Sequence, residues 1–105
     1  MKIIDVNAKN LGCTTDFYKA LLGELGAPVW HGMSINALID SIIYGRINEI
    51  NPPLTIRVSY SENTSKAVLH EIAILKEQLS IHRREKFLSQ GRDTEVDLVL
   101  AEEVV

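Results

Sequence analysis

The sequence has few of the residues that would cross-link a chain or anchor it in a membrane. Cys13 is the one cysteine among 105 residues, so no disulfide can form within the chain, and a reducing compartment is indicated. The N-terminal apolar run meets Asp5 after two isoleucines, and no later run approaches the length of a membrane span. We therefore expect a cytoplasmic protein without a signal peptide and without membrane contact.

Basic residues are also scarce. The chain has 11 Lys and Arg against 14 Asp and Glu, a net charge of −3, whereas a protein that binds nucleic acid normally presents a basic face. We therefore expect no direct contact with nucleic acid. The charge is uneven, because residues 93–105 contain five acids and no base, while residues 82–86 are basic. Both segments are typical of solvated surface, although an acidic balance would also suit docking onto a basic protein.

Signatures of catalysis and of metal binding are absent from the sequence. The three histidines, His31, His70 and His82, lack metal-ligand spacing, and no glycine-rich loop that follows a strand could hold a phosphate. Cys13 and a histidine could form a nucleophile and its base, but no local motif supports this. We expect Cys13 to pack as a small apolar residue near the end of the first strand. The expectation is therefore no enzyme, no cofactor and no metal.

The residues that are present suit a globular chain. Hydrophobic residues make up 46% and charged residues 24%, and the length favours a single domain over residues 1–105. Apolar runs and alternating patterns predict strands at residues 2–6, 54–60 and 95–100. In the second and third of these, apolar and polar residues alternate, which predicts that one face of the sheet carries no helices.

Helical periodicity fills the segments between the strands. One helix is predicted over residues 15–25, with Thr14 or Thr15 as its cap and Gly26 at its end. A long helix should run from residue 64 or 65 to the mid-eighties, either alone or followed by a short second piece around residues 87–88. It should bury the stripe Val68, Ile72, Leu75 and Leu79. Long helical connections favour parallel strands. The predicted fold class is α/β: a three-stranded parallel sheet with three to four helices packed on one face, in two layers.

The second helix, capped by Ser34 and running to about residue 44, has two different faces. Its apolar arc contains Ile35, Leu38, Ile39 and Ile42, and the opposite row contains Asn36, Asp40 and Tyr44, with Ala37 and Ser41 beside it. Trp30 and His31 precede this helix, and Gly32 permits a positive φ. One interpretation is an ordinary amphipathic helix with Trp30 in the core. The other is an exposed binding surface bordered by the two rings.

The segment LGELGAPVWHGMSINALID resembles the signature of the barstar family, cytoplasmic inhibitors of ribonucleases. That signature is a leucine-rich helix followed by Leu-x-x-Pro-x-aromatic-aromatic-Gly-x-Asn-x-Asp-Ala-Leu-x-Asp. The match is gapless from Leu25 to Asp40 and includes Pro28, Trp30, His31, Gly32, Ala37 and Leu38. The sequence departs from the signature at Ser34, where the family has asparagine, and at Asn36, where it has its first aspartate. Ile39 replaces a frequent tryptophan.

The resemblance implies a fold and a mechanism. The fold is a two-layer, three-stranded parallel sheet with helices on one side. In this family the second helix and the preceding loop block the ribonuclease active site; Asp40 matches the aspartate that mimics a substrate phosphate, Trp30 the loop aromatic, and Gly32 the turn glycine. Because the interface residues diverge, an immunity protein against a nuclease toxin, such as those of contact-dependent growth inhibition, fits better than an inhibitor of the original ribonuclease.

The expected interface with one toxin molecule consists of Trp30, His31, Gly32, Ser34, Asn36, Asp40 and Tyr44. The alternative is a regulatory protein-binding module that docks the same helix on a non-nuclease partner.

Overall fold

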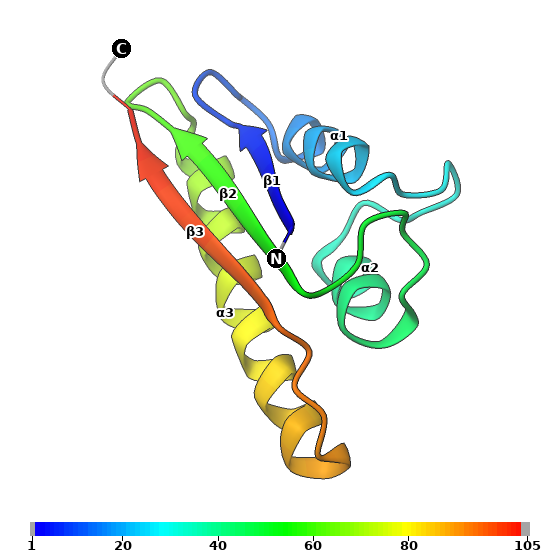
Figure 1. Cartoon of the computed structure of the whole chain (residues 1–105). Coiled ribbons are helices and arrows are strands. Elements are labelled where there is room, and N and C mark those ends of the chain that lie inside the picture. Colours follow the sequence, from blue (N-terminus) through cyan, green and yellow to red (C-terminus); the bar gives the residue numbers. More distant parts are fainter. Residues whose placement is uncertain (1, 104–105) are drawn as a thin grey trace.

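A parallel three-stranded sheet and three helices make up the fold. The computed structural model describes residues 2–103. In chain order the elements are β1 (Lys2–Asn7), α1 (Thr14–Leu25), α2 (Ile35–Ile39) with its π-helical continuation η1 (Asp40–Gly45), β2 (Leu54–Tyr60), α3 (Lys66–Gln90) and β3 (Val96–Glu102). The strands lie in the order β1–β2–β3, and both neighbouring pairs are parallel (Figure 1). The predicted strands and their parallel arrangement are confirmed.

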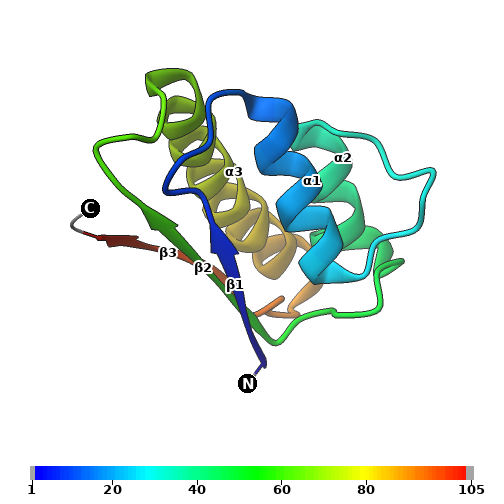
Figure 2. The same ribbon diagram turned by 90° about the horizontal axis from the view of Figure 1, so that it is seen from above.

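All three helices lie on the same face of the sheet, so the molecule has two layers (Figure 2). The alternation in β2 explains this arrangement, because Leu54, Ile56 and Val58 are buried under the helices, while Arg57 points to the open face. There the Arg57 guanidinium makes two hydrogen bonds to the carboxylate of Asp5, its partner in the β1–β2 register. These bonds lower the pKa of Asp5. The prediction that one face carries no helices is confirmed.

The core is formed by the inner sheet face and one stripe from each helix. From α3, the predicted stripe Val68, Ile72, Leu75 and Leu79 is buried. From α1, Phe17, Tyr18, Leu21 and Leu25 are buried. The Tyr18 hydroxyl donates to the Glu71 carboxylate at 2.7 Å, which joins α1 to α3. Burial, and the hydrogen bond to Glu71, raise the pKa of Tyr18.

Gly26 ends α1 as predicted, whereas the N-cap of α1 and the C-terminal end of α3 differ from the predictions. The N-cap of α1 is Cys13 and not Thr14 or Thr15 as predicted, and it makes no side-chain capping bond. Cys13 is also exposed, so it is not the packed apolar residue expected. The helix α3 continues without a break to Gln90, so no separate piece exists at residues 87–88. Helix α3 begins at Lys66 with Ser65 as its N-cap, close to the predicted start at residue 64 or 65. Gly26 ends α1 in the left-handed conformation, as predicted.

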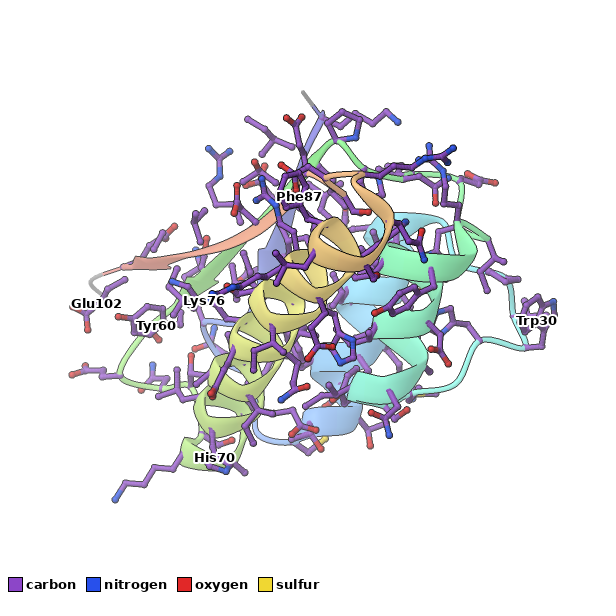
Figure 3. The ribbon with its side chains drawn as sticks, turned by 90° about the horizontal axis from the view of Figure 1, so that it is seen from below. Trp30, Tyr60, His70, Lys76, Phe87 and Glu102 are labelled. Atoms are coloured by element: carbon purple, nitrogen blue, oxygen red, sulfur yellow. The ribbon has the colours of Figure 1, made fainter. Side chains whose placement is uncertain are left out.

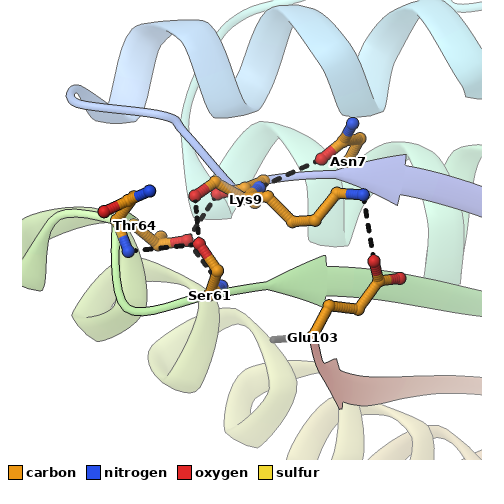
Figure 4. Close-up of polar contacts among 7 residues, drawn as sticks. Asn7, Lys9, Ser61, Thr64 and Glu103 are labelled. Carbon is orange, nitrogen blue, oxygen red and sulfur yellow. Dashed lines mark hydrogen bonds and ion pairs between the residues drawn. The ribbon is translucent and has the colours of Figure 1, made fainter. Parts of the chain in front are cut away.

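Polar side chains tie the loops at the carboxyl ends of the strands to one another (Figure 4). The hydroxyls of Ser61 and Thr64 donate to the carbonyl oxygens of Lys9 and Ala8, which joins the loop after β2 to the loop after β1. The Lys9 ammonium lies 2.9 Å from the carboxylate of Glu103, just beyond β3. The ends of all three strands are therefore held in one polar network.

Within residues 2–103, no helix combines the length and the apolar character needed to cross a bilayer.

Candidate functional site

The segment that carries the predicted site residues is a short α-helix followed by a π-helical turn. Ser34 caps it, since its hydroxyl accepts a hydrogen bond from the Ala37 N–H at 3.1 Å. After Ile39 the spacing widens, and the Arg46 N–H bonds the Ser41 carbonyl five residues earlier at 2.9 Å. A single α-helix to residue 44 was expected. Gly45 permits the wider turn, because a Cβ there would lie 2.9 Å from the Asp40 carbonyl oxygen.

The two faces of this segment are separated largely as the periodicity predicts. Leu38, Ile39 and Ile42 are buried, and Ile35 is partly buried rather than fully so. The outward row of Asn36, Asp40 and Tyr44 is exposed. Asp40 forms no ion pair with any of residues 2–103. Its carboxylate is therefore free of a structural partner and is available to a ligand.

Trp30 lies at the tip of the loop before α2 and points away from the body of the protein (Figure 3). Its side chain is 71% exposed, so the interpretation that placed it in the core is wrong. Other large apolar side chains around this helix and its flanking loops are exposed too: Val29, Met33, Tyr44 and Ile47. A group of exposed apolar side chains of this kind typically marks a surface that binds another molecule.

His31, next in sequence, is only 8% exposed. One ring nitrogen, Nδ1, lies 2.7 Å from the Gly32 carbonyl oxygen, and since a carbonyl only accepts, Nδ1 carries a proton. The other, Nε2, lies 2.7 Å from the Ser41 hydroxyl, which also accepts from the Asn48 side-chain amide at 3.1 Å. The His31 ring is therefore almost buried, in contrast to the Trp30 ring beside it. The bond between His31 and Ser41 fastens the Trp30 loop to η1. The loop after η1 folds back over Ser41 and adds the bond from Asn48.

Four of the predicted residues meet around one hollow of about 300 Å³. Trp30, His31, Gly32 and Asp40 line it together with Ala37, Ser41, Gly45 and Ile47. Its walls are mostly apolar and its charged group is the Asp40 carboxylate. Such a hollow suits a cationic or aromatic group of a partner, which could contact the Trp30 ring and pair with Asp40.

Gly32 has a different role from the one predicted. Positive φ among the described glycines is confined to Gly26 and Gly91, so Gly32 is not in the left-handed region. A Cβ at Gly32 would lie 3.3 Å from the Ala37 Cβ. The glycine therefore permits close approach of the loop to the helix rather than an unusual backbone conformation.

Ser34, Asn36 and Tyr44 do not line the hollow. The Tyr44 hydroxyl lies 3.1 Å from His82 Nδ1 on α3, and the two rings meet edge to face. The Lys86 ammonium donates to the Ile43 carbonyl at 2.7 Å. His82 and Lys86 belong to the basic segment that was interpreted as solvated surface. Both instead contact η1 from α3.

The predicted site did not include four residues that line the hollow: Ala37, Ser41, Gly45 and Ile47. Ile47 follows the predicted end of the helix and belongs to no periodic pattern, so it carried no signal. Ser41 was placed beside the outward row, although it is buried. Ser41 lies at the boundary between the two faces of the helix. It is buried because the loops that contain His31 and Asn48 cover it.

Among the described residues no three His, Cys, Asp or Glu side chains are grouped so that they could hold a metal ion. No family model matches the chain, and no curated protein matches it in sequence.

Proposed function

We propose that this protein is a cytoplasmic immunity protein with a barstar-like fold that inhibits a ribonuclease toxin by blocking its active site. The observation that carries the proposal is the Trp30–Asp40 hollow. A carboxylate that forms no ion pair within residues 2–103 and an exposed aromatic ring border one concavity. This concavity is on the outer side of a helix whose inner side lies in the core. The order of strands and helices agrees with the fold that the resemblance implies.

The mechanism follows from the charge of the target. A ribonuclease active site holds Arg, Lys and His side chains arranged for a phosphate, and a carboxylate on a rigid helix can replace that phosphate with charge-assisted hydrogen bonds. The apolar walls of the hollow exclude water from this pair, and the Trp30 ring supplies the buried anchor typical of tight interfaces. One toxin molecule binds one chain.

The neutral Asn36 removes one carboxylate that the resemblance would place at the interface. Acidic residues at the rim therefore supply the long-range attraction, consistent with the net charge of −3. We expect the association rate to fall as the salt concentration rises.

The test is inhibition by variants of the surface. The chain is co-expressed with the product of the reading frame immediately upstream, which under this proposal encodes the toxin. The affinity of the purified pair is then measured by stopped-flow association and dissociation. Asp40→Ala should weaken binding by about 2–5 kcal/mol, mainly through faster dissociation, because it leaves a buried cation of the toxin unpaired. Trp30→Ala should weaken the binding free energy by more than about 2 kcal/mol.

Both variants should melt at the wild-type temperature, since neither side chain stabilises the fold. The matched control is Glu62→Ala, an exposed acid in the turn between β2 and α3. If Asp40→Ala and Trp30→Ala protect cells as well as wild type does, the inhibitory surface lies elsewhere. If the same two residues are needed to capture a partner that has no nuclease activity, the chain is a regulatory binding module instead.

A further inference from the structure

A second hollow begins where the Trp30–Asp40 hollow ends along the chain. Gly45 and Ile47 line the Trp30–Asp40 hollow, whereas Arg46 between them lines a separate cavity of about 220 Å³. The rest of this cavity is formed by the loop before β2, the end of α3 and the loop before β3: Pro52, Pro53, Lys86, Arg92, Asp93, Thr94 and Glu95. The two loops enter the sheet at the same end, because β2 and β3 are parallel neighbours (Figure 1). We call this cavity the basic pocket.

Three cations line the basic pocket without an acidic partner. Arg46, Lys86 and Arg92 form no ion pair with any of residues 2–103. Arg46 Nη2 lies 3.5 Å from the Pro52 carbonyl oxygen, and the Lys86 ammonium donates to the Ile43 carbonyl. A guanidinium has five N–H donors and an ammonium three, so most of the donors of these side chains remain available to a ligand.

Two carboxylates also line the pocket, and the cations outnumber them. The carboxylate of Asp93 is bonded at both oxygens by Arg83, whose Nε and Nη2 lie 2.7 and 2.9 Å away. Its charge is therefore partly compensated from outside the pocket. Glu95 is exposed and forms no ion pair within the described chain. The pocket keeps a positive charge, which attracts an anion.

Thr94 adds a hydroxyl that lacks a partner. The residue lines the pocket and is only 8% exposed, and its hydroxyl makes no hydrogen bond with the described residues. Polar groups of buried residues are normally bonded to the protein, to water or to a ligand. A ligand oxygen in the basic pocket would supply the missing partner of Thr94.

The backbone of Arg46 is strained. Among residues 2–103, Arg46 is the non-glycine residue with a positive φ, at 51° with ψ 42°. A side chain raises the energy of this left-handed conformation, whereas glycine adopts it freely. Such strain often occurs at functional sites, where the surrounding structure maintains it. Here it accompanies a guanidinium that lines the pocket.

We propose that the basic pocket binds a phosphate group with two negative charges, either free phosphate or the phosphomonoester of a small molecule. The forked N–H donors of Arg46 and Arg92 match pairs of phosphate oxygens, and Lys86 supplies a further positive charge. The Thr94 hydroxyl donates to another oxygen. No residue of the Trp30–Asp40 hollow takes part, so this site is independent of the toxin-binding surface.

A ¹⁵N NMR titration of the whole chain with sodium phosphate tests the proposal. The pH is slightly above neutral, where phosphate carries two charges, and sodium chloride keeps the ionic strength constant. The amide signal of Thr94 and the Nε–H signals of Arg46 and Arg92 should follow one saturation curve, with a dissociation constant below about 1 mM. A parallel titration with a nucleoside 5′-monophosphate distinguishes the two sources. Tighter binding than phosphate assigns the pocket to a phosphomonoester, and weaker binding assigns it to free phosphate.

Variants test which side chains hold the anion. Arg46→Gly and Arg92→Gln should each raise the dissociation constant about tenfold or more, because each removes a charged donor. Arg46→Gly also removes the backbone strain, so it should unfold at a temperature no lower than the wild type does. Glu95→Gln should bind phosphate more tightly, because it removes an uncompensated carboxylate. A purely structural role for these residues would not produce this gain.

Arg84→Gln is the matched control, since Arg84 is an exposed arginine on α3 that does not line the basic pocket. It should bind phosphate like the wild type. A wild-type dissociation constant above about 1 mM overturns the proposal. It is also overturned if Arg46→Gly and Arg92→Gln keep the wild-type affinity, because the anion would then bind elsewhere. The titration contains no toxin, so its failure is distinct from a failure of the proposed function.

Discussion

Trp30 and His31 are adjacent in the sequence, yet the first ring is in solvent and the second is in the interior. Their separation follows from hydrogen bonding. The imidazole has two polar nitrogens, and the structure satisfies both of them internally, through Gly32 and Ser41. A buried polar group is tolerated only when it is bonded in this way. The loop that presents Trp30 therefore depends on a serine ten residues away.

Ser41→Ala tests this dependence. The substitution removes the hydroxyl that bonds both His31 Nε2 and the Asn48 side-chain amide, and these buried groups lose a partner. We expect a loss of about 1–3 kcal/mol in the free energy of unfolding, measured by urea denaturation. Ser80→Ala, on the exposed side of α3, is the control and should change stability by less than about 0.5 kcal/mol. Equal stability of Ser41→Ala and wild type would show that the network does not hold the loop.

At the scale of elements, the π-helical turn η1 is the feature that shapes the site. It places Asp40 at the start of the wider turn and Gly45 at its end, and both line the Trp30–Asp40 hollow. Single-turn π-helices occur frequently at functional sites. Here the turn is supported from outside by Lys86, which bonds the Ile43 carbonyl.

Gly45→Ala should destabilise the protein by about 1–3 kcal/mol, because its new Cβ would press on the Asp40 backbone at 2.9 Å. Urea denaturation provides the measurement. Gly23→Ala in α1 is an informative control, since a Cβ there meets nothing within 4 Å and should stabilise the helix by about 0.5–1 kcal/mol. If Gly45→Ala were neutral, the turn would not require glycine.

For the whole molecule, the acidic C-terminal segment is partly neutralised by basic residues distant in sequence. Arg83 bonds Asp93 and Asp97, and Lys9 bonds Glu103. The hydrogen bond from Arg83 lowers the pKa of Asp93, and that from Lys9 lowers the pKa of Glu103. Because these pKa values are lower in the folded than in the unfolded chain, their contribution to stability is present at neutral pH. It is lost as the pH falls below about 4 and through the folded pKa.

Arg83→Gln should therefore make the stability of the protein less dependent on pH in the acid range, because Asp93 would then titrate similarly in the folded and unfolded states. Urea denaturation at pH 7 and at about pH 3, at low protein concentration, measures the difference. Arg84→Gln, which removes an exposed charge next to Arg83 on the same helix, is the control and should keep the wild-type pH dependence. If Arg83→Gln kept the wild-type pH dependence, the hydrogen bonds of Arg83 would not be the cause of the lowered pKa of Asp93.

Local pattern was sufficient to predict the strands and the positions of the helices with their buried sides, but not the π-helical turn η1. The alternation of residues 54–60 predicted a strand with one open face, and the spacing of Val68, Ile72, Leu75 and Leu79 predicted the buried side of α3. The outward direction of Asp40 was predictable for the same reason. Periodicity records which side of an element is buried, since that is a property of consecutive residues.

Only the tertiary structure decided what meets on the outer side of α2 and η1. The order of the strands, the burial of His31 and Ser41, and the presence of Ile47 in the hollow all depend on loops that fold back over a distant part of the chain. No residue near Ser41 in the sequence indicates that Asn48 covers it. The hollow exists because three segments converge there, and convergence is determined by contacts between residues far apart in sequence, which no local pattern records.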